Sequence, residues 1–292
     1  MTCSLTRSAA MLAASLLLAG RVEAAPRLAI AVAARAIQPG ELIVLTITAD
    51  EAPPTMRVQV FGRGIAAFRL DDGTWRALVG VDLDQRPGRY TAVVDASVGG
   101  HALRASQELV VEERAFPTRT LRVEPDFVNP SPSLLARIAD EQTFTRAVYA
   151  RSAAARVWSA PFVRPVPQAA NSSFGTRSVF NGERRSPHAG TDFLSPAGTP
   201  VKAPNAGRIV AARALFYTGN TVIVDHGLGV FSTLAHLSRI DVHEGDLVAP
   251  GELLGLVGAT GRVTGPHLHW ALSVSGARVD PLSLLELLGS ER

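Results

Sequence analysis

The strongest constraint on the fold is a short segment near the C-terminus, Gly265-Pro266-His267-Leu268-His269-Trp270. It continues into Ala271-Leu272-Ser273-Val274, a composition typical of a β-strand. Alternate side chains of a strand leave the same face roughly 6.5–7 Å apart. The imidazoles of His267 and His269 are therefore expected to point toward one region.

Three further side chains upstream carry related chemistry. His188 and Asp192 are spaced H-x-x-x-D, and His236 lies in Ala235-His236-Leu237-Ser238. Taken singly, His236 could be a core histidine, and His267 and His269 could be an exposed strand pair. Together the three motifs supply the nitrogen and carboxylate ligands that zinc favours, and they leave imidazoles for proton transfer. The combination indicates metal-assisted hydrolysis.

The H-x-x-x-D spacing needs a particular backbone path. Pro187 and Gly190 argue against a helix, in which His188 and Asp192 would share a face. On a straight strand the two would lie about 13 Å apart, too far for one metal with bonds of roughly 2.1 Å. We therefore expect the chain to turn at the Ala189-Gly190 step.

The remaining histidines have structural interpretations. His226 ends a predicted strand beside Gly227 and is expected to be a hydrogen-bonding structural residue. His243 lies in a polar turn and is expected to be solvated. His101 follows Gly99-Gly100 at a predicted hairpin tip, where an exposed histidine is expected.

Composition fits globular domains and excludes some partners. The chain has 292 residues, of which 47% are hydrophobic and 19% charged. The net charge is +3, and the 26 acidic residues are interleaved with the basic ones. We find no basic run with interleaved aromatics, so the sequence does not predict nucleic-acid binding.

Residues 1–24 resemble a secretory signal. Arg7 precedes an apolar run from Ala9 to Gly20, and small residues at Val22 and Ala24 predict cleavage after Ala24. The protein is therefore expected to be periplasmic or secreted, with no transmembrane segment in the mature chain. The one cysteine, Cys3, lies in the leader, so the mature chain cannot form disulfides.

Turn and proline signals divide the chain into four parts: a signal peptide at 1–24, an immunoglobulin-like β-sandwich at 25–113, a connector at 114–160, and a second β-rich domain at 161–292. Asp72-Gly73 predicts a hairpin in the sandwich. The connector is expected to hold a helix from about Ser133 to Arg151, with Ser131 as N-cap. The apolar face of that helix would include Leu135 and Ile138. The predicted fold class is mostly β, with an antiparallel sheet and a groove in the second domain.

The quoted motifs, together with Phe174-Gly175, Gly219 to Gly227, Gly258 to Gly261 and Val279-Asp280-Pro281, resemble the lysostaphin-type (LytM-type) zinc metallopeptidases of bacterial cell walls. The resemblance runs from about Pro161 to Leu288. It implies that His188, Asp192 and His269 bind one Zn²⁺ per chain. His236 and His267 would then remain free for catalysis, and which of them is the general base stays open.

The same resemblance implies an enzyme, a metalloendopeptidase that hydrolyses peptide stems of peptidoglycan through a metal-activated water. The bond would join D-alanine to meso-diaminopimelate, with glycine-bridge cleavage as the alternative. A different possibility is a catalytically silent regulator that activates another cell-wall hydrolase. We expect a monomer, in which the sandwich and the connector helix restrain the groove.

Overall fold

The computed structural model describes residues 27–289 apart from 123–125, 127, 160, 173 and 185. The predicted signal peptide, 1–24, lies outside these residues. The first part of the chain contains β1 (Leu28–Ala34), β2 (Leu42–Ala49), β3 (Met56–Val60), β4 (Arg63–Arg69), β5 (Trp75–Gly80), β6 (Gly88–Val98) and β7 (His101–Val111). The connector contains β8 (Thr118–Leu121) and α1 (Pro132–Tyr149).

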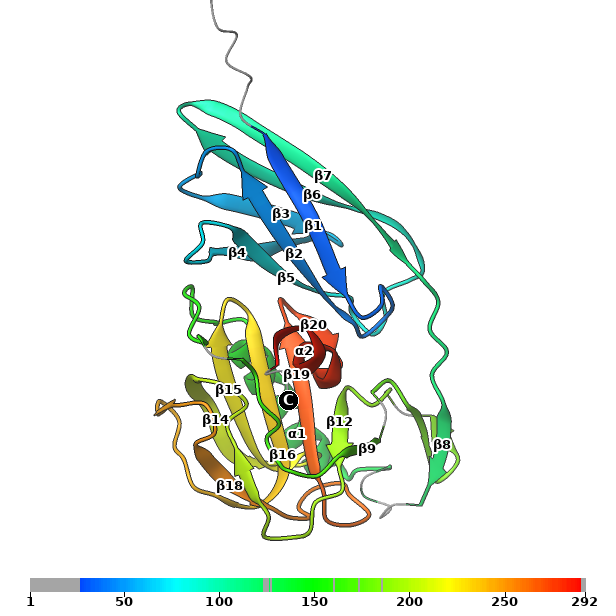
Figure 1. Cartoon of the computed structure of the whole chain (residues 1–292). Helices are drawn as coiled ribbons and strands as arrows, with labels where there is room; N and C mark the ends of the chain where they lie inside the picture. Colours follow the sequence, from blue (N-terminus) through cyan, green and yellow to red (C-terminus); the bar gives the residue numbers. More distant parts are fainter. Residues whose placement is uncertain are drawn as a thin grey trace, which may run out of the picture.

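The rest of the chain is again β-rich. It contains β9 (Ala170–Ser172), β10 (Arg177–Phe180), β11 (Glu183–Arg184), β12 (Gly190–Phe193), β13 (Pro200–Lys202), β14 (Gly207–Leu215), β15 (Gly219–Gly227), β16 (Val230–Ile240), β17 (Leu247–Val248), β18 (Leu253–Val257), β19 (Leu268–Val274), β20 (Ala277–Val279) and α2 (Pro281–Leu288). The predicted mostly antiparallel β class is confirmed. Figure 1 shows two β units, one above the other, with α2 and β20 at their junction.

Strands β1 to β7 form the sandwich, in the order β1-β2-β5-β4-β3-β6-β7. β4 joins its two halves because its first residues pair with β3 and its last with β5. Alternate residues from both halves, such as Leu45, Val58 and Val94, meet in one core. The predicted hairpin at Asp72-Gly73 is confirmed as the β4–β5 turn.

The second unit is built on a ten-stranded sheet whose main path is β17-β14-β15-β16-β19-β12-β9. One face carries the main core, to which Leu234 and Trp270 contribute fully buried side chains. The adjacent residues Ala235 and His269 pair across β16 and β19, so they lie on the opposite face. The core therefore fixes the register that presents His269 away from it.

Helix α1 begins after Ser131, which caps it as predicted by accepting a bond from the Leu134 amide. Its contact face agrees with the predicted one at Ile138, which is 7% exposed, and differs from it at Leu135, which is 53% exposed. Phe144, Val148 and Tyr149 pack instead on Ala211, Ile223 and Phe231. The Tyr149 hydroxyl also lies 2.6 Å from Thr233 Oγ1. Thr233 and Leu234 are consecutive residues of β16 and therefore lie on opposite faces of the sheet. Because Leu234 lies on the core face, α1 packs on the face that carries His269.

Strand β8 is a feature of the connector that the sequence did not predict. It pairs in parallel with β10, with Arg119 opposite Ser178. In Figure 1 it lies at the side of the second unit, away from β14. The connector is therefore part of the wall beside β12 rather than a free linker.

The sandwich and the second unit share a continuous apolar interface. Leu42, Val44 and Leu78 of the sandwich belong to the same buried cluster as the core of the second sheet. A side chain at Gly80 would meet Ala277 and the side chain of Val279 at less than 3 Å, so the two units are in direct contact there. A chain starting near Pro161 would lose part of its own core.

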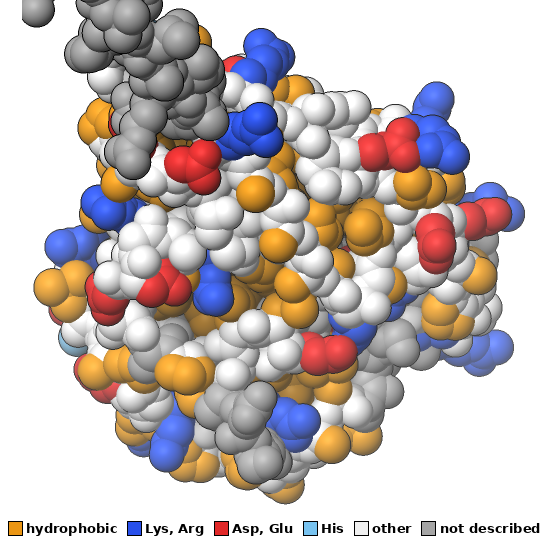
Figure 2. Space-filling view, turned by 45° about the horizontal axis from the view of Figure 1, so that its top comes forward, with side chains coloured by type: hydrophobic (Ala, Val, Ile, Leu, Met, Phe, Trp, Pro, Cys, Tyr) orange, Lys and Arg blue, Asp and Glu red, His pale blue; other side chains and the backbone are white. Residues whose placement is uncertain are grey.

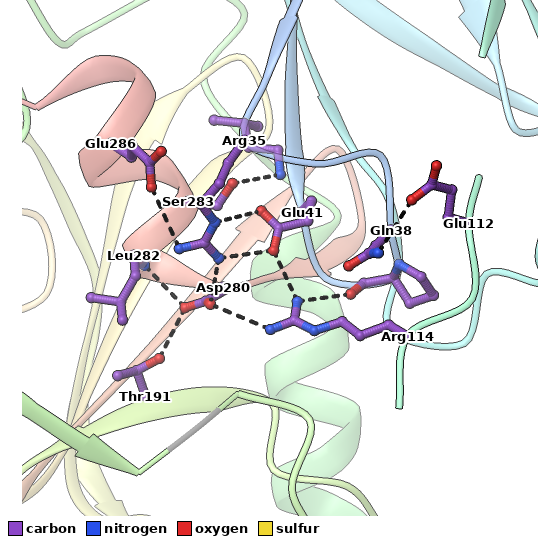
Figure 3. Close-up of polar contacts among 12 residues, drawn as sticks. Arg35, Gln38, Glu41, Glu112, Arg114, Thr191, Asp280, Leu282, Ser283 and Glu286 are labelled. Carbon is purple, nitrogen blue, oxygen red and sulfur yellow. Dashed lines mark hydrogen bonds and ion pairs between the residues drawn. The ribbon is translucent and has the colours of Figure 1, made fainter. Parts of the chain in front are cut away.

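A buried ion network lies at this interface (Figure 3). Glu41, 3% exposed, accepts bonds from Arg35 at 2.8 and 3.0 Å and from Arg114 at 3.0 Å. Arg35 also donates to Asp280 at 2.9 Å. Asp280 caps α2 and accepts a bond from Thr191 Oγ1, next to Asp192. The network therefore ties the sandwich to the strand that carries a predicted metal ligand.

One outer face of the molecule is of mixed charge. Figure 2 shows basic and acidic side chains interspersed on one face, with no large field of either sign. Within the part of the chain that the structure describes, no helix combines the length and apolarity that crossing a bilayer requires.

Histidines outside the predicted site lie as expected. The His226 side chain is fully buried, donates from Nδ1 to the Ala206 carbonyl at 2.7 Å and accepts at Nε2 from Ser232 at 2.9 Å. Burial is the main cause that lowers its pKa to about 4. The His243 side chain is 91% exposed. His101 is likewise exposed beside its glycine turn. The structural interpretations of these three residues are confirmed.

Replacing Glu41 with alanine should lower the free energy of unfolding by about 3 kcal/mol, because the partly buried guanidinium groups of Arg35 and Arg114 are then left with Asp280 as their one buried counter-charge. Chemical denaturation measures this. Asp84→Ala is the matched control: its carboxylate pairs with Arg278 at the same interface but is 74% exposed. It should cost less than about 1 kcal/mol. Equal losses in the two variants would show that the buried network does not stabilise the interface.

The His226 pKa gives a pH-dependent prediction. In the folded protein this pKa is about 4, below the ordinary value of 6.5. The stability contributed by the neutral, buried imidazole is therefore complete above pH 6.5 and is lost as the pH falls toward 4. The loss should amount to about 3 kcal/mol, at 1.36 kcal/mol per pKa unit. Comparing wild type with His226→Gln from pH 7 to pH 4 isolates it, with the exposed His243→Gln as control. A wild-type–variant difference that stays constant with pH would contradict this assignment.

Candidate metal centre and groove

Two paired strands position the core of the site. Asp192 on β12 is directly opposite His269 on β19, so both side chains leave the same face of the sheet. His188 lies just before β12, held by backbone bonds to Gly175 and Thr176. The structure therefore brings together the three residues predicted to bind zinc.

The donor atoms of these residues form a close triangle. His188 Nε2 lies 3.0 Å from Asp192 Oδ1 and 3.0 Å from His269 Nδ1, and the latter two atoms are 2.9 Å apart. Neighbouring ligands around tetrahedral zinc are about 3.4 Å apart for bonds of about 2.1 Å. Two imidazole nitrogens and one carboxylate oxygen at this spacing fit a metal ion that keeps an open coordination position.

Gly190 makes this convergence possible. The predicted turn at Ala189-Gly190 is replaced by the start of β12 at Gly190, which pairs with Ala271. A Cβ at Gly190 would lie 2.6 Å from Cε1 of His269. The absence of a side chain therefore lets the His269 ring lie over β12 and reach Asp192.

Burial and hydrogen bonding set the charge of the triangle. Burial alone would raise the pKa of Asp192, but the bonds from His188 and His269 outweigh it and hold that pKa well below its usual range. Burial also lowers the pKa of His269, against the opposing bond to Asp192. At neutral pH the site therefore offers an ionised carboxylate beside a neutral imidazole, the protonation states that a metal requires.

His236 lies next to the triangle in an unusual backbone conformation. Its φ is 65°, inside β16, and its amide bonds to the Thr218 carbonyl. The ring donates from Nδ1 to the Thr260 carbonyl at 2.9 Å, which leaves Nε2 as the acceptor. Burial, with the neighbouring His269 and His267, lowers the pKa of His236 to about 3. Nothing in the sequence pattern predicts this left-handed backbone conformation. Such conformations of non-glycine residues cluster at functional sites.

His267 is oriented in the same way. Its Nδ1 donates to the Gly265 carbonyl at 2.9 Å, and its Nε2 lies 3.8 Å from Asp192 Oδ1. The ring centroids of His236 and His267 are 4.8 Å apart. Both imidazoles are therefore held by backbone carbonyls, and each has one nitrogen left for proton transfer beside the triangle.

A groove of about 320 Å³ contains all five of these side chains. Arg262, Val263 and Thr264, from the turn before β19, also line it. None of the described residues that line it comes from the sandwich. The sandwich contacts the opposite end of β19, where Arg63 bonds the Ser275 carbonyl. The predicted restraint of the groove therefore does not come from the sandwich lying over it.

Three groove residues escaped the sequence analysis. Tyr217 lies in the β14–β15 turn, Phe180 on β10 and Arg119 on β8. Tyr217 and Phe180 are aromatic residues in ordinary turn and strand contexts. Arg119 reaches the groove through the parallel β8–β10 pairing, which no local pattern indicates.

The chain is similar to known peptidases over the region that contains the site. The sequence model of peptidase family M23 matches residues 186–281, a range that contains all five side chains. Peptidoglycan DD-endopeptidase ShyA of Vibrio cholerae is 43% identical over 113 residues, which are 38% of this chain and 26% of that protein. DD-carboxypeptidase/endopeptidase Mpg of Neisseria meningitidis is 43% identical over 97 residues, 33% of this chain and 22% of that protein. The chain therefore spans about a quarter of the length of these curated relatives.

One solved structure is similar over a much larger share of the chain. A crystal structure of a peptidase M23 from Pseudomonas aeruginosa is 33% identical, with a TM-score of 0.68, and the match covers 85% of this chain and 95% of that one. An alignment of this extent includes most of the described residues on both sides of the connector. Because this match combines 33% identity with a shared architecture over most of both chains, the chain belongs to peptidase family M23.

Proposed function

We propose that this protein is a zinc-dependent endopeptidase that hydrolyses peptide cross-links of bacterial peptidoglycan. The observation that carries the proposal is the triangle of His188, Asp192 and His269 beside two imidazoles, all within one groove. The names of ShyA and Mpg supply the substrate class. A protein that acts on this substrate would work outside the cytoplasm, as the predicted leader also implies.

His188, Asp192 and His269 would hold one zinc ion per chain. When bound, zinc acidifies a coordinated water and polarises the scissile carbonyl. The side chains around the metal would then accept and donate the protons of the reaction. His267, with Nε2 3.8 Å from Asp192 Oδ1, lies beside the three ligands and would accept a proton from the attacking water and donate one to the leaving amine. His236, neutral at pH 7, offers a second acceptor that orients the reacting groups.

The silent-regulator alternative lacks support from the site. A protein that only activates another hydrolase has no need of a complete ligand set. Here all three ligands and both remaining histidines converge, and two backbone carbonyls orient the latter pair. We further propose that residues 161–292 form the catalytic unit and that 25–113 form an accessory unit packed behind β12.

The function can be tested on purified cross-linked muropeptides, with mass spectrometry of the products. The protein should release uncross-linked peptides, and a chelator should stop the reaction until zinc is restored. Metal analysis should find about one zinc per chain, and His188→Ala, Asp192→Ala and His269→Ala should each lose most of it because one of three ligands is gone. Full zinc occupancy in His269→Ala, or cleavage that survives chelation, would overturn the ligand assignment.

The two remaining histidines are predicted to behave differently. His236→Ala and His267→Ala should keep zinc, since neither belongs to the triangle, but each should lose activity by roughly 10²–10⁴-fold. The double variant should lose less than the product of the two effects if both rings act on one transition state. Zinc content and kcat are measured on the same samples, with His243→Ala as control. Loss of zinc from His267→Ala would sink the assignment.

A further inference from the structure

The turn between β14 and β15, residues 216–218, holds the backbone of His236. Tyr217 and Thr218 from this turn line the groove, and the Thr218 carbonyl accepts a bond from the His236 amide at 2.9 Å. Among the described residues other than glycine that line the groove, only His236 has a positive φ. Such a conformation persists only where surrounding contacts hold it. The position of the Thr218 carbonyl therefore determines where the His236 ring lies.

The same turn packs on a second turn, which holds the His236 ring. The Thr260 carbonyl of that second turn accepts from Nδ1 of His236 at 2.9 Å. Two bonds join the turns to each other: the Arg262 amide donates to the Tyr217 carbonyl, and the Asn220 amide donates to Thr260 Oγ1, both at 2.9 Å. Because the backbone and the ring of His236 are held by two turns in mutual contact, a displacement of residues 216–218 would displace this imidazole.

Helix α1 holds the outer side of the turn through one carboxylate. Glu141 Oε2 accepts from the Phe216 amide at 2.7 Å, and Glu141 Oε1 accepts from Arg137 Nε, also at 2.7 Å. The Glu141 side chain is only 20% exposed, so this charge-assisted bond to the amide is largely shielded from water. The Phe216 ring packs edge-on against Tyr217, with the centroids 4.9 Å apart. Glu141 therefore joins the connector helix to a wall of the groove.

We propose that Glu141 is a positioning residue for the reaction, which holds residues 216–218 and thereby keeps the His236 ring beside the metal triangle. This inference rests on the proposed function and deepens it. Glu141 does not line the groove, so it acts only through the residues that it holds. It also lies outside residues 186–281, the range that the family model matches. The connector helix is thus part of the machinery that places a proton-transferring group.

A double-mutant cycle tests whether Glu141 acts through His236. In the zinc-loaded protein, Glu141→Ala should lower kcat on cross-linked muropeptides by about 10-fold, because a small displacement of a reacting group is costly. Zinc content should not change. In a His236→Ala background the same substitution should lower kcat by less than about 2-fold, because no ring is left to position. An equal loss in both backgrounds, as a purely structural role predicts, would overturn the proposal.

Two further variants separate the hydrogen bond from other effects on the helix. Glu141→Gln keeps an oxygen that can accept from the Phe216 amide, and it should retain most of the activity. Asp140→Ala is the matched control, since it removes the neighbouring, exposed carboxylate of α1 and should leave kcat unchanged. A loss in Asp140→Ala as large as that in Glu141→Ala would show that helix charge, and not the bond to the turn, is responsible.

Amide hydrogen exchange, resolved by NMR, tests the same contact without using activity. The His236 amide should exchange about 10-fold faster in Glu141→Ala than in wild type, because its acceptor lies on the released turn. The Ser275 amide, bonded to the Gly229 carbonyl at the other end of β16, is the internal reference and should not change. Unchanged exchange at His236 would overturn the proposal. If the wild type cleaves no muropeptide, the proposed function fails, and exchange alone decides whether Glu141 holds His236.

Discussion

The buried carboxylate of Asp192 is the group on which the rest of the site depends. It accepts from two imidazoles at about 3 Å, and it reaches them only because β12 and β19 pair in a register that places it opposite His269. That register is held in turn by Trp270 and Leu268, which are buried on the other face of β19. A shift by one residue would turn His269 into the core and Trp270 into the groove.

The sandwich contributes to the site from behind. The strand residue next to Asp192, Thr191, points to the core side and bonds Asp280, which Arg35 joins to Glu41 of the sandwich. The shared apolar cluster makes this contact part of the fold rather than a loose docking of two units. The sandwich therefore supports β12, while the connector strand β8 forms part of the groove wall.

Sequence patterns predicted much of this structure because the relevant signals are local. Strand composition located β19, Asp72-Gly73 located the β4–β5 turn, and Ser131 marked the start of α1. The features that escaped depend on tertiary contacts. Neither the parallel β8–β10 pairing nor the φ of 65° at His236 has a local signature. The predicted face of α1 was wrong at Leu135, because the helix buries its aromatic C-terminal residues instead.

We propose that His188, Asp192 and His269 hold a zinc ion in the groove. Anomalous diffraction above and below the zinc absorption edge, from crystals of the protein grown with zinc, locates the ion directly. We expect one strong peak bounded by His188 Nε2, Asp192 Oδ1 and His269 Nδ1, with His236 and His267 outside bonding distance. A peak bonded to His267 in place of His269, or no peak at this triangle, would contradict it.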